Sequence, residues 1–532
     1  MSTPLARPIS ARPESMVSGG GNCPDATEEL RGVRTSGIQP PAWRCRMSNK
    51  ASKRCNRQQG DSAMDGGTRY DRVQYPAGLY PTTLPDRLAA IARIHGLAAP
   101  DPATAHVLEV AGGDGVNVIA MAAAWPAARF LSFDLSAAAV ARGGALAEAA
   151  GLSNVRVEVG DVIEAAKSMA GPFDYIIVHG LYAWVPEPVR VATLKLIGRL
   201  LSPNGVAFVS YNAQPGGHLR TAIREMLMHH VRDIADPAAR VARAREVLRD
   251  FSAPRPTDRP AISALRQIAE PMLRKNNGSL YHDELSDCYA PVSLAEFVAA
   301  AAPHGLGFLA DALPAMVYDG LPGRDLSDAE TVHAAQADDY DVVTFFHQTL
   351  LVRSGRGPRR RIDPACFANL FASSTAKRTG EISFVFDERE FEVEDAWLAD
   401  FLGALGEAWP RRLALSGFAS SAERCDALIR LYQREIVALH AAPLPAALDP
   451  GERPCASPLA RAQLVRGDVT LYTLDHRMLA FVEPGPRAFL ALLDGTRDRA
   501  QLAADWAASG YGDQVSVDEA LRQVAHAGTL TY

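Results

Sequence analysis

Short apolar runs alternate with amphipathic segments in the first half of the chain, and this alternation predicts a sheet with helical crossovers. Five runs rich in apolar residues are typical of buried strands, and they lie at 107–110, 130–133, 155–159, 175–178 and 206–210. The segments around them space apolar residues three or four positions apart and predict helices at 86–95, 117–125, 136–150 and 188–201. Because parallel strands are joined by helices that cross the sheet, we expect a mostly parallel, twisted α/β sheet.

The strand pattern stops near residue 217, and the second half of the chain changes character twice. Helical spacing dominates at first, and an acidic stretch and an arginine cluster follow. A proline-rich segment near 443–458 then has the composition of a linker. We therefore expect a sheet-containing core at 64–216, a helical domain at 217–320, a mainly helical region at 321–450 and a small α/β or winged-helix-like unit at 451–532 that includes strands at 464–472.

The first 63 residues differ from the rest in charge and composition. They hold ten Lys and Arg against five Asp and Glu, and they are rich in Ser, Gly and Pro. Such a segment has too few apolar residues to offset the entropy of ordering the chain. We expect 1–63 to be a disordered basic extension, with Met64 as an alternative translation start.

Overall composition narrows the class of protein. The chain has 532 residues, of which 48% are hydrophobic and 22% charged, as in soluble globular proteins. Its formal net charge of −6 argues against a nucleic-acid-binding protein, and no apolar run is long enough to insert stably in a membrane. The seven cysteines are odd in number, scattered and without a CxxC pair, which favours the cytoplasm and no metal site.

A glycine cluster after the first strand carries the clearest chemical signal. Gly112, Gly113 and Gly115 surround Asp114 between a strand and a helix, where glycine lets a ligand approach the backbone closely. A dinucleotide fingerprint would need a third glycine where Val118 stands. An NAD-dependent oxidoreductase is therefore the least favoured function.

Three acids accompany this turn at successive strands. Glu109 lies inside the first strand, Asp134 ends the second, and Asp161 follows the third. An acid beside the turn suits an ammonium group, an acid after the second strand can accept from ribose hydroxyls, and one after the third can accept from an adenine amino group. Together they predict a phosphate-free site for S-adenosylmethionine.

These residues resemble the motifs of class I methyltransferases. Segments at 70–88, 179–186 and 210–216 resemble, more narrowly, the bacterial family with a methyltransferase regulatory domain, which includes the rickettsial protein-lysine methyltransferases. The resemblance implies a Rossmann-like methyltransferase core, S-adenosylmethionine as cofactor and lysine side chains of a protein partner as acceptors. Ala111 departs from the pattern where a first glycine is usual, and Gly217 departs where an aromatic residue is expected.

The predicted site has a cofactor part and an acceptor part at the carboxyl edge of the sheet. Tyr75 is expected in a lid over the cofactor, and the other expected cofactor contacts are Glu109, Ala111, Gly112, Gly113, Asp114, Gly115, Asn117, Asp134, Leu135, Asp161, Val162 and His179. The acceptor is expected between aromatic walls and polar groups that desolvate a lysine and lower its pKa. The residues expected there are His179, Tyr182, Trp184, Tyr211 and Asn212.

The residues leave three functions open. The favoured one is transfer of a methyl group to protein lysine. The second is transfer to a small molecule, and the third is a non-catalytic cofactor-binding module, which the departures at Ala111 and Gly217 would favour. The sequence also leaves open whether the chain forms a homodimer.

Overall fold

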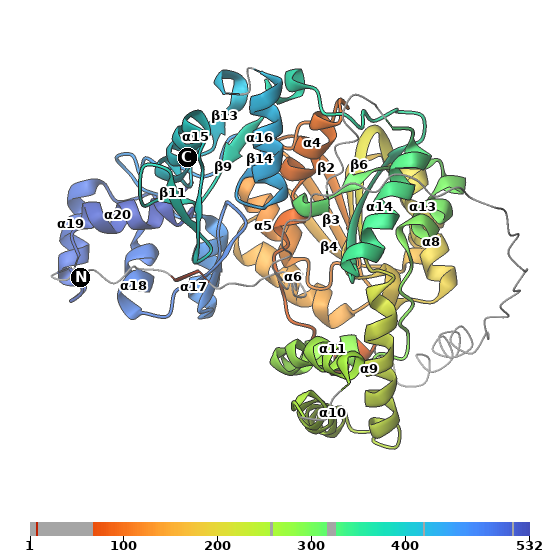
Figure 1. The fold of residues 1–532 in the computed structure, drawn as a ribbon. Helices are drawn as coiled ribbons and strands as arrows, with labels where there is room; N and C mark the ends of the chain where they lie inside the picture. The colour runs from red at the N-terminus through yellow and green to blue at the C-terminus, as the bar shows by residue number, and fades with distance from the viewer. Residues whose placement is uncertain are drawn as a thin grey trace, which may run out of the picture.

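The computed structural model describes residues 68–255, 259–316, 326–418, 421–512 and 515–531, together with the backbone of Arg7–Pro8. The extension expected at 1–63 lies outside the described residues, except for Arg7–Pro8 (β1), which pairs with a C-terminal strand. Figure 1 shows a central sheet flanked by helices, a helical arm below it and a C-terminal unit beside it.

A seven-stranded sheet forms the centre of the molecule, in the order β4-β3-β2-β5-β6-β8-β7. Its first five strands are parallel and lie where the apolar runs predicted them. They are β2 (His106–Val110), β3 (Arg129–Asp134), β4 (Val155–Val159), β5 (Phe173–Val178) and β6 (Leu201–Asn212). The predicted Rossmann-like α/β fold is confirmed.

Helices cover both faces of the sheet (Figure 1). One face carries α4 (Pro85–Ile94), α5 (Val116–Ala124) and α6 (Ala137–Ala149), and the other carries α7 (Val162–Ser168), α8 (Glu187–Leu200) and α13 (Leu294–Ala301). Side chains of each strand alternate between these two cores: in β6, Phe208 enters the first and Val209 the second. The turns after β2 to β6 meet at the carboxyl edge.

Local signals set the ends of α6. The Ser136 side chain accepts a hydrogen bond from the backbone N–H of Ala139 and caps the first turn. Gly151 follows the last turn with φ of +64°, a conformation that glycine adopts at little cost. Both ends agree with the predicted helix at 136–150.

The sheet does not end at residue 216, where the core was expected to stop. β7 (Leu306–Asp311) and β8 (Phe346–Arg353) extend it as antiparallel strands, and β8 pairs with β6. The regions 217–320 and 321–450 therefore contain strands, although helical segments were expected there. The apolar run Leu350–Val352 is short, and its partner strand is distant in sequence, so local spacing did not reveal it.

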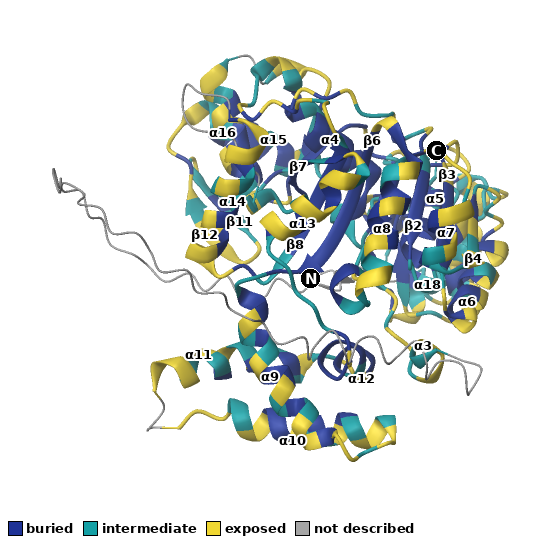
Figure 2. Ribbon diagram, turned by 90° about the vertical axis from the view of Figure 1, so that its right-hand side faces the viewer, coloured by how far each residue is buried: buried dark blue, intermediate teal, exposed yellow. Residues whose placement is uncertain are grey.

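A helical arm projects from the carboxyl edge of the sheet (Figures 1 and 2). It consists of α9 (Gly216–Val231), α10 (Pro237–Ser252) and α11 (Pro260–Ala269). Leu227, Leu248 and Met272 belong to a small core within the arm. Figure 2 shows the buried faces of α9 and α10 turned toward each other and the exposed faces turned outward. The arm is thus packed on itself and attached to the sheet through α9.

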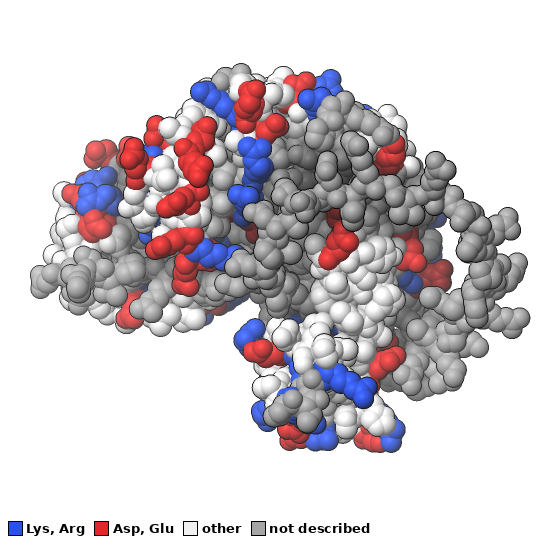
Figure 3. Space-filling model, in the orientation of Figure 1, with Lys and Arg blue, Asp and Glu red and all other residues white. Residues whose placement is uncertain are grey.

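The region after β8 forms a mixed layer rather than a mainly helical one. Two three-stranded sheets, with strand orders β10-β11-β12 and β13-β9-β14, pack with α15 (Ala396–Ala408) and α16 (Ala422–Gln433). Figure 3 shows acidic side chains gathered over this part of the surface. The strands are β9 (Phe371–Ser373), β10 (Lys377–Arg378), β11 (Ser383–Phe386), β12 (Arg389–Glu392), β13 (Leu413–Ala414) and β14 (Ala438–His440).

The C-terminal unit combines helices with a short strand pair. Its elements are α17 (Pro458–Arg466), β15 (Thr470–Tyr472), β16 (Met478–Ala480), α18 (Pro484–Leu492), α19 (Arg499–Ala508) and α20 (Val517–His526). Phe481, Phe489 and Trp506 lie in its own core. The strand expected at 464–472 begins only at Thr470, because Leu464–Arg466 completes α17. Within the described residues, no helix is both long and apolar enough to cross a membrane.

Candidate cofactor and acceptor site

The glycine turn joins β2 to α5 through residues in the left-handed backbone region. The φ angles of Ala111, Gly113 and Gly115 are +56°, +61° and +66°. An added β-carbon on Gly113 would meet no atom within 4 Å, so the backbone there is open to a ligand. The conformation of Ala111 costs a non-glycine residue about 1–2 kcal/mol. The turn therefore keeps the glycine-like shape despite the alanine.

Glu109 lies beneath this turn as a fully enclosed carboxylate. It accepts hydrogen bonds from Asn117 Nδ2 at 2.8 Å and from Ser132 Oγ at 3.1 Å. A β-carbon on Gly112 would come within 2.4 Å of Glu109 Oε2, so only glycine leaves room for this carboxylate. Burial raises the pKa of Glu109 to about 7, with the two hydrogen bonds opposing the shift. The site thus holds an acid that a cationic ligand would stabilise as the carboxylate.

Asp134 connects the turn to the neighbouring strand. Its carboxylate accepts from the backbone N–H of Gly113 at 2.9 Å and from that of Ser136 at 2.8 Å. Burial raises the pKa of Asp134, and the hydrogen bonds from backbone N–H groups oppose that shift. Glu109 and Asp134 therefore lie on two sides of the same turn, as their positions at the ends of neighbouring strands predicted.

Asp161 has a clear structural role at the next strand. It caps α7, because its Oδ1 accepts from the backbone N–H groups of Ile163 and Glu164 at 2.7 and 3.1 Å. Asp161 also lines a groove of about 570 Å³ that Phe133 and Gly160 border. Gly160 donates its backbone N–H to the Asp134 carbonyl, which places the two strand ends side by side. The expected contact of Asp161 with an adenine stays a prediction.

Leu135 and Val162, the two hydrophobic residues expected around the cofactor, differ in their exposure to solvent. Leu135 exposes 58% of its surface at the end of β3. Val162 begins α7 and is buried in the core between α7 and the sheet. Leu135 is thus free to cover a ligand, whereas Val162 contributes mainly through packing.

An N-terminal segment lies across the carboxyl edge of the sheet. Tyr80 donates its backbone N–H to Asn117 Oδ1 at 3.0 Å, and its ring lies 3.8 Å from that of His179, centre to centre. Asp71 accepts a hydrogen bond from the Ser136 hydroxyl, which holds the pKa of Asp71 at about 2. This segment contacts residues around the turn, and its role as a lid over the cofactor stays a prediction.

Tyr75 ties the N-terminal segment to residues that follow the helical arm in sequence, rather than to the turn. Its hydroxyl donates to Asp283 Oδ1 at 3.4 Å. His282 stacks on the Tyr70 ring at 4.2 Å and contacts the Val73 carbonyl through Nε2 at 2.6 Å. Lys275 completes the link with an ion pair to Asp283 at 2.8 Å. Residues 275–283, which follow α11, therefore hold the outer part of the N-terminal segment.

The acceptor candidates divide between the two faces of the sheet. His179 Nδ1 lies 3.1 Å from Ser210 Oγ, on the same face as Tyr80. Burial lowers the pKa of His179 to about 4, so its ring is neutral near pH 7. Asn212 is 4% exposed, and its side-chain oxygen has no hydrogen-bond partner among the described residues. That oxygen is a buried hydrogen-bond acceptor without a partner in the part of the chain that the structure describes, and its expected contact with an acceptor amine stays a prediction.

Tyr182 and Tyr211 lie in the protein core rather than around a pocket, contrary to expectation. Both pack with Phe297 in the core under α13, and the Tyr211 hydroxyl lies 2.9 Å from Thr349 Oγ1. The cause is the pleat of β6, which turns Tyr211 to the face opposite Asn212. These two tyrosines support the edge of the sheet from behind.

Trp184 belongs to an aromatic and arginine cluster where the arm meets the sheet. Its ring lies 5.0 Å from that of Tyr289, and Arg224 stacks on Tyr289 at 4.5 Å. Arg220 pairs with the buried Glu284 at 2.6 Å. Gly217 packs closely on Pro291, because a β-carbon on it would come within 2.6 Å of that proline. Close packing explains why an aromatic side chain is absent at Gly217.

Asn117 has more contacts than its position after the turn suggested. Besides its bond to Glu109, it donates to Thr83 Oγ1 at 3.1 Å and contacts His476 Nε2 at 2.8 Å. One amide thus joins the turn, the lid and the C-terminal unit. No spacing pattern could have indicated these contacts, because the partners are 34 and 359 residues away.

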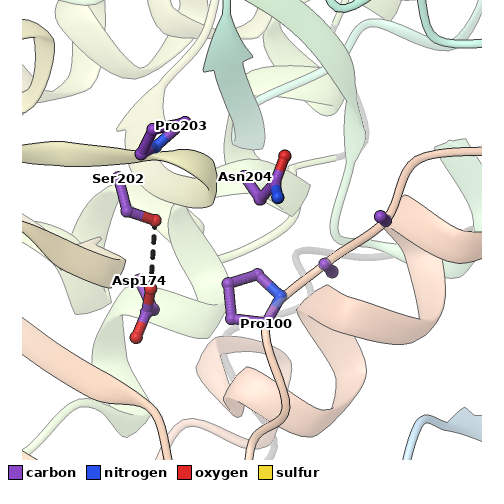
Figure 4. A pocket seen from close by; sticks show the side chains of 7 residues that line it. Pro100, Asp174, Ser202, Pro203 and Asn204 are labelled. Carbon is purple, nitrogen blue, oxygen red and sulfur yellow. Dashed lines mark hydrogen bonds between the residues drawn. The ribbon is translucent and has the colours of Figure 1, made fainter.

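A second hollow lies away from this site. It has a volume of about 360 Å³ and lies at the opposite edge of the sheet, where β5 and β6 begin (Figure 4). Ser202 donates to Asp174 at its wall, next to Pro100 and Asn204. No group of three or more potential metal ligands occurs among the described residues. The carboxyl edge therefore remains the candidate site.

Comparison with protein-family models finds two matching regions. Residues 107–205 match a methyltransferase domain, and residues 452–530 match the C-terminal winged helix domain named for PKMT proteins. The first region contains the turn and its three acids. The second covers nearly all of the C-terminal unit expected at 451–532.

Relatives with similar sequences come from Rickettsia prowazekii (strain Madrid E). One uncharacterized protein is 30% identical over 302 residues, which cover 55% of this chain and 54% of the relative. Another is 38% identical over 161 residues, which cover 30% of this chain and 64% of the relative. The chain thus matches between about half and two thirds of the length of these two relatives.

A solved structure shares the fold over nearly its whole length. PKMT2 from Rickettsia typhi superimposes with a TM-score of 0.71 and 21% identity, covering 86% of this chain and 99% of that one. The same protein has been solved in complex with AdoHcy.

Proposed function

We propose that this chain, with its methyltransferase domain at 107–205 and its PKMT-type winged helix domain at 452–530, is an S-adenosylmethionine-dependent methyltransferase that modifies lysine side chains of a protein. The observation that carries the proposal is the enclosed Glu109 carboxylate beneath a glycine turn that Asp134 fastens from the next strand. The likeness to PKMT2, a protein solved with AdoHcy, supports the same cofactor and class of acceptor. We place this reaction in the cytoplasm.

The residues at the turn fit this cofactor chemically. S-adenosylmethionine carries an ammonium and a sulfonium but no phosphate, and it supplies the methyl group when bound. Glu109 offers a carboxylate to the ammonium, and the open face of Gly113 allows close approach. Asp134 keeps carboxylate lone pairs for ribose hydroxyls while it fixes the turn. A diphosphate would be repelled by the same acids.

The acceptor amine has to arrive neutral and in line with the methyl group. Closure of the lid over His179 excludes water, and desolvation lowers the pKa of a lysine. The unpaired Asn212 Oδ1 accepts one N–H of the amine and thereby turns its lone pair toward the methyl carbon. His179, with a pKa of about 4, is too weak a base to take the amine's proton. The amine therefore gives its proton to solvent water as it enters the site, while desolvation is lowering its pKa.

The test combines cofactor binding with identification of the product. S-adenosylhomocysteine binding is measured by calorimetry for the wild type, Asp134→Ala and Asp134→Asn. Asp134→Ala loses the hydrogen bonds from the backbone N–H groups of Gly113 and Ser136, and its affinity should fall about 100-fold. Asp134→Asn has the same shape, and its affinity should fall less. Unchanged affinity in Asp134→Ala would defeat the assignment of the site.

Radiolabelled methyl transfer into a lysate identifies the acceptor. We expect label in the protein fraction, released on hydrolysis as methylated lysine. Label confined to metabolites would instead establish a small-molecule acceptor. Tight cofactor binding without label in any fraction would indicate a non-catalytic module.

A further inference from the structure

The C-terminal unit reaches into the cofactor turn through one histidine. His476 lies in the tight turn between β15 and β16, with φ of +65°. It is 2% exposed, and its Nε2 lies 2.8 Å from Asn117 Oδ1, although the two residues are 359 positions apart. A side chain of the last unit is therefore in contact with the first helix after the glycine turn.

The direction of this hydrogen bond follows from the other contacts of Asn117. Its Nδ2 donates to the Glu109 carboxylate and to Thr83 Oγ1, which fixes the orientation of the amide. Oδ1 then accepts, both from His476 and from the backbone N–H of Tyr80. His476 therefore carries its proton on Nε2. Burial lowers the pKa of His476 to about 3, so this donor is the neutral ring.

The turn that presents His476 is held firmly. Asp475 accepts from the Thr473 hydroxyl and pairs with Arg477. The Arg477 guanidinium stacks on Trp409 at 4.7 Å from the ring centre. The backbone carbonyl of Gly528 accepts a hydrogen bond from the Leu474 N–H. The ring is thus positioned by contacts of its own turn, including one with Trp409 of the preceding region, and not by Asn117 alone.

The whole unit is docked against the helices that flank the turn. Helix α17 contacts α6 and α5. Leu459 and Leu474 share one continuous core with Ile119 of α5. The hydrogen bond of His476 therefore spans an apolar interface that fixes its geometry.

We propose that His476 is a positioning residue for the cofactor site: through Asn117 it holds the Glu109 carboxylate and the Tyr80 segment in the arrangement that the cofactor binds. This inference rests on the proposed function. Its physical basis is that Asn117, without the donor from His476, keeps fewer partners and can rotate away from Glu109. Cofactor binding would then have to bring Asn117 back into its hydrogen bond with Glu109, and the affinity would fall by the free energy that this requires.

A matched pair of substitutions tests this role. His476→Gln keeps an N–H donor at about the position of Nε2, whereas His476→Met has similar length and no donor; both are unbranched and meet the same backbone conformation. We expect His476→Met to weaken S-adenosylhomocysteine binding about tenfold and to raise KM for the methyl donor with little change in kcat. His476→Gln should stay within about threefold of the wild type.

Three results would overturn the inference. Wild-type affinity in both variants shows that the hydrogen bond is irrelevant, and equal weakening in both shows that ring shape matters instead. A wild type that binds no S-adenosylhomocysteine defeats the proposed function itself and this inference with it. Leu502→Ala, which removes a buried side chain of the C-terminal core in α19, an element that does not carry His476, controls for loss of stability in that unit.

Hydrogen exchange on the wild type decides the matter if His476→Met does not fold. Coupling between two sites is reciprocal, so the bound ligand should stabilise the docked turn. Addition of S-adenosylhomocysteine should slow exchange of the amides at 470–480 more than exchange in α19, which belongs to the same unit. Equal effects in both segments would contradict a specific link through His476.

Discussion

Gly143 of α6 and the backbone carbonyl of Asp114 are in such close contact that a β-carbon on Gly143 would lie 1.9 Å from that oxygen. The helix after β3 therefore packs directly on the glycine turn, backbone against backbone. Gly144, its neighbour, faces open space, with no atom within 4 Å of an added β-carbon. Two adjacent glycines in one helix thus have opposite structural roles.

The substitution Gly143→Ala should displace the turn. We expect a loss of about 1–3 kcal/mol in the free energy of unfolding, because the methyl group overlaps backbone that has to move. The shift of Asp114 should also weaken S-adenosylhomocysteine binding. Gly144→Ala is the matched control, and it should gain up to about 1 kcal/mol from helix propensity. Urea unfolding and calorimetry measure both effects, and equal behaviour of the two variants would contradict the contact.

Ala111→Gly should stabilise the protein. Ala111 has φ of +56°, and a glycine there avoids a strain of about 1–2 kcal/mol. Glycine also has more conformational freedom in the unfolded chain, which lowers the free energy of unfolding by about 0.5–1 kcal/mol. We expect a net gain of up to about 1.5 kcal/mol and unchanged cofactor affinity. A marked fall in affinity would show that the alanine methyl itself contacts the ligand.

Cofactor affinity should depend on pH through Glu109. In the free protein, burial raises its pKa to about 7, whereas an ammonium beside it favours the carboxylate. Below pH 7, binding therefore has to release a proton, and affinity should fall by up to about tenfold per pH unit. Calorimetry in buffers of different ionisation enthalpy detects that proton. Glu109→Gln should bind weakly with a flat pH profile, and a flat profile in the wild type would contradict the pairing.

His347 should make stability depend on pH in the alkaline range. Burial alone would lower its pKa, but the hydrogen bonds to Asp311 and Asp339, at 2.9 and 3.0 Å, raise it to about 9. The folded-state pKa exceeds the unfolded one, so the stabilisation is fully present below about pH 6.5 and is lost as pH rises through 9. We expect a loss of up to about 3 kcal/mol.

Thermal unfolding at a series of pH values measures this loss. The substitution His347→Gln should lower the midpoint at neutral pH and flatten its decline between about pH 7 and 9. If the unfolding midpoint of His347→Gln falls at alkaline pH as steeply as that of the wild type, groups other than His347 cause the fall. The His347 cluster lies behind Tyr211, at 5.6 Å between rings, so cofactor binding should change little.

Local signals were sufficient to predict the parallel half of the sheet. Each of its strands is a short apolar run, and each connecting helix has its own start or stop, as Ser136 and Gly151 show for α6. Glu109 and Asp134 could be placed for the same reason, since residues at the ends of parallel strands share one edge. Strands β7 and β8 escaped prediction because they lie outside the regular strand–helix alternation, in a part of the chain where helical spacing dominates.

In the acceptor region, the alternation of side chains along β6 already separates two of the expected residues. Tyr211 and Asn212 are adjacent in β6, and a strand turns adjacent side chains to opposite faces, so both could not line one pocket. His476 is a different case. Its contact with Asn117 depends on how a separate unit docks, and no pattern near either residue encodes that.

The hydrogen bond between His476 and Asn117 also sets an order of events during protein synthesis. The ribosome adds 359 residues after Asn117 before His476 exists, which takes about 20–70 s at the usual rates of elongation. The nascent chain therefore carries its glycine turn for most of its synthesis without the final donor. Full affinity for the methyl donor should appear only close to release of the finished polypeptide, so that a translation product that stops before His476 should bind the methyl donor more weakly than a chain that includes His476.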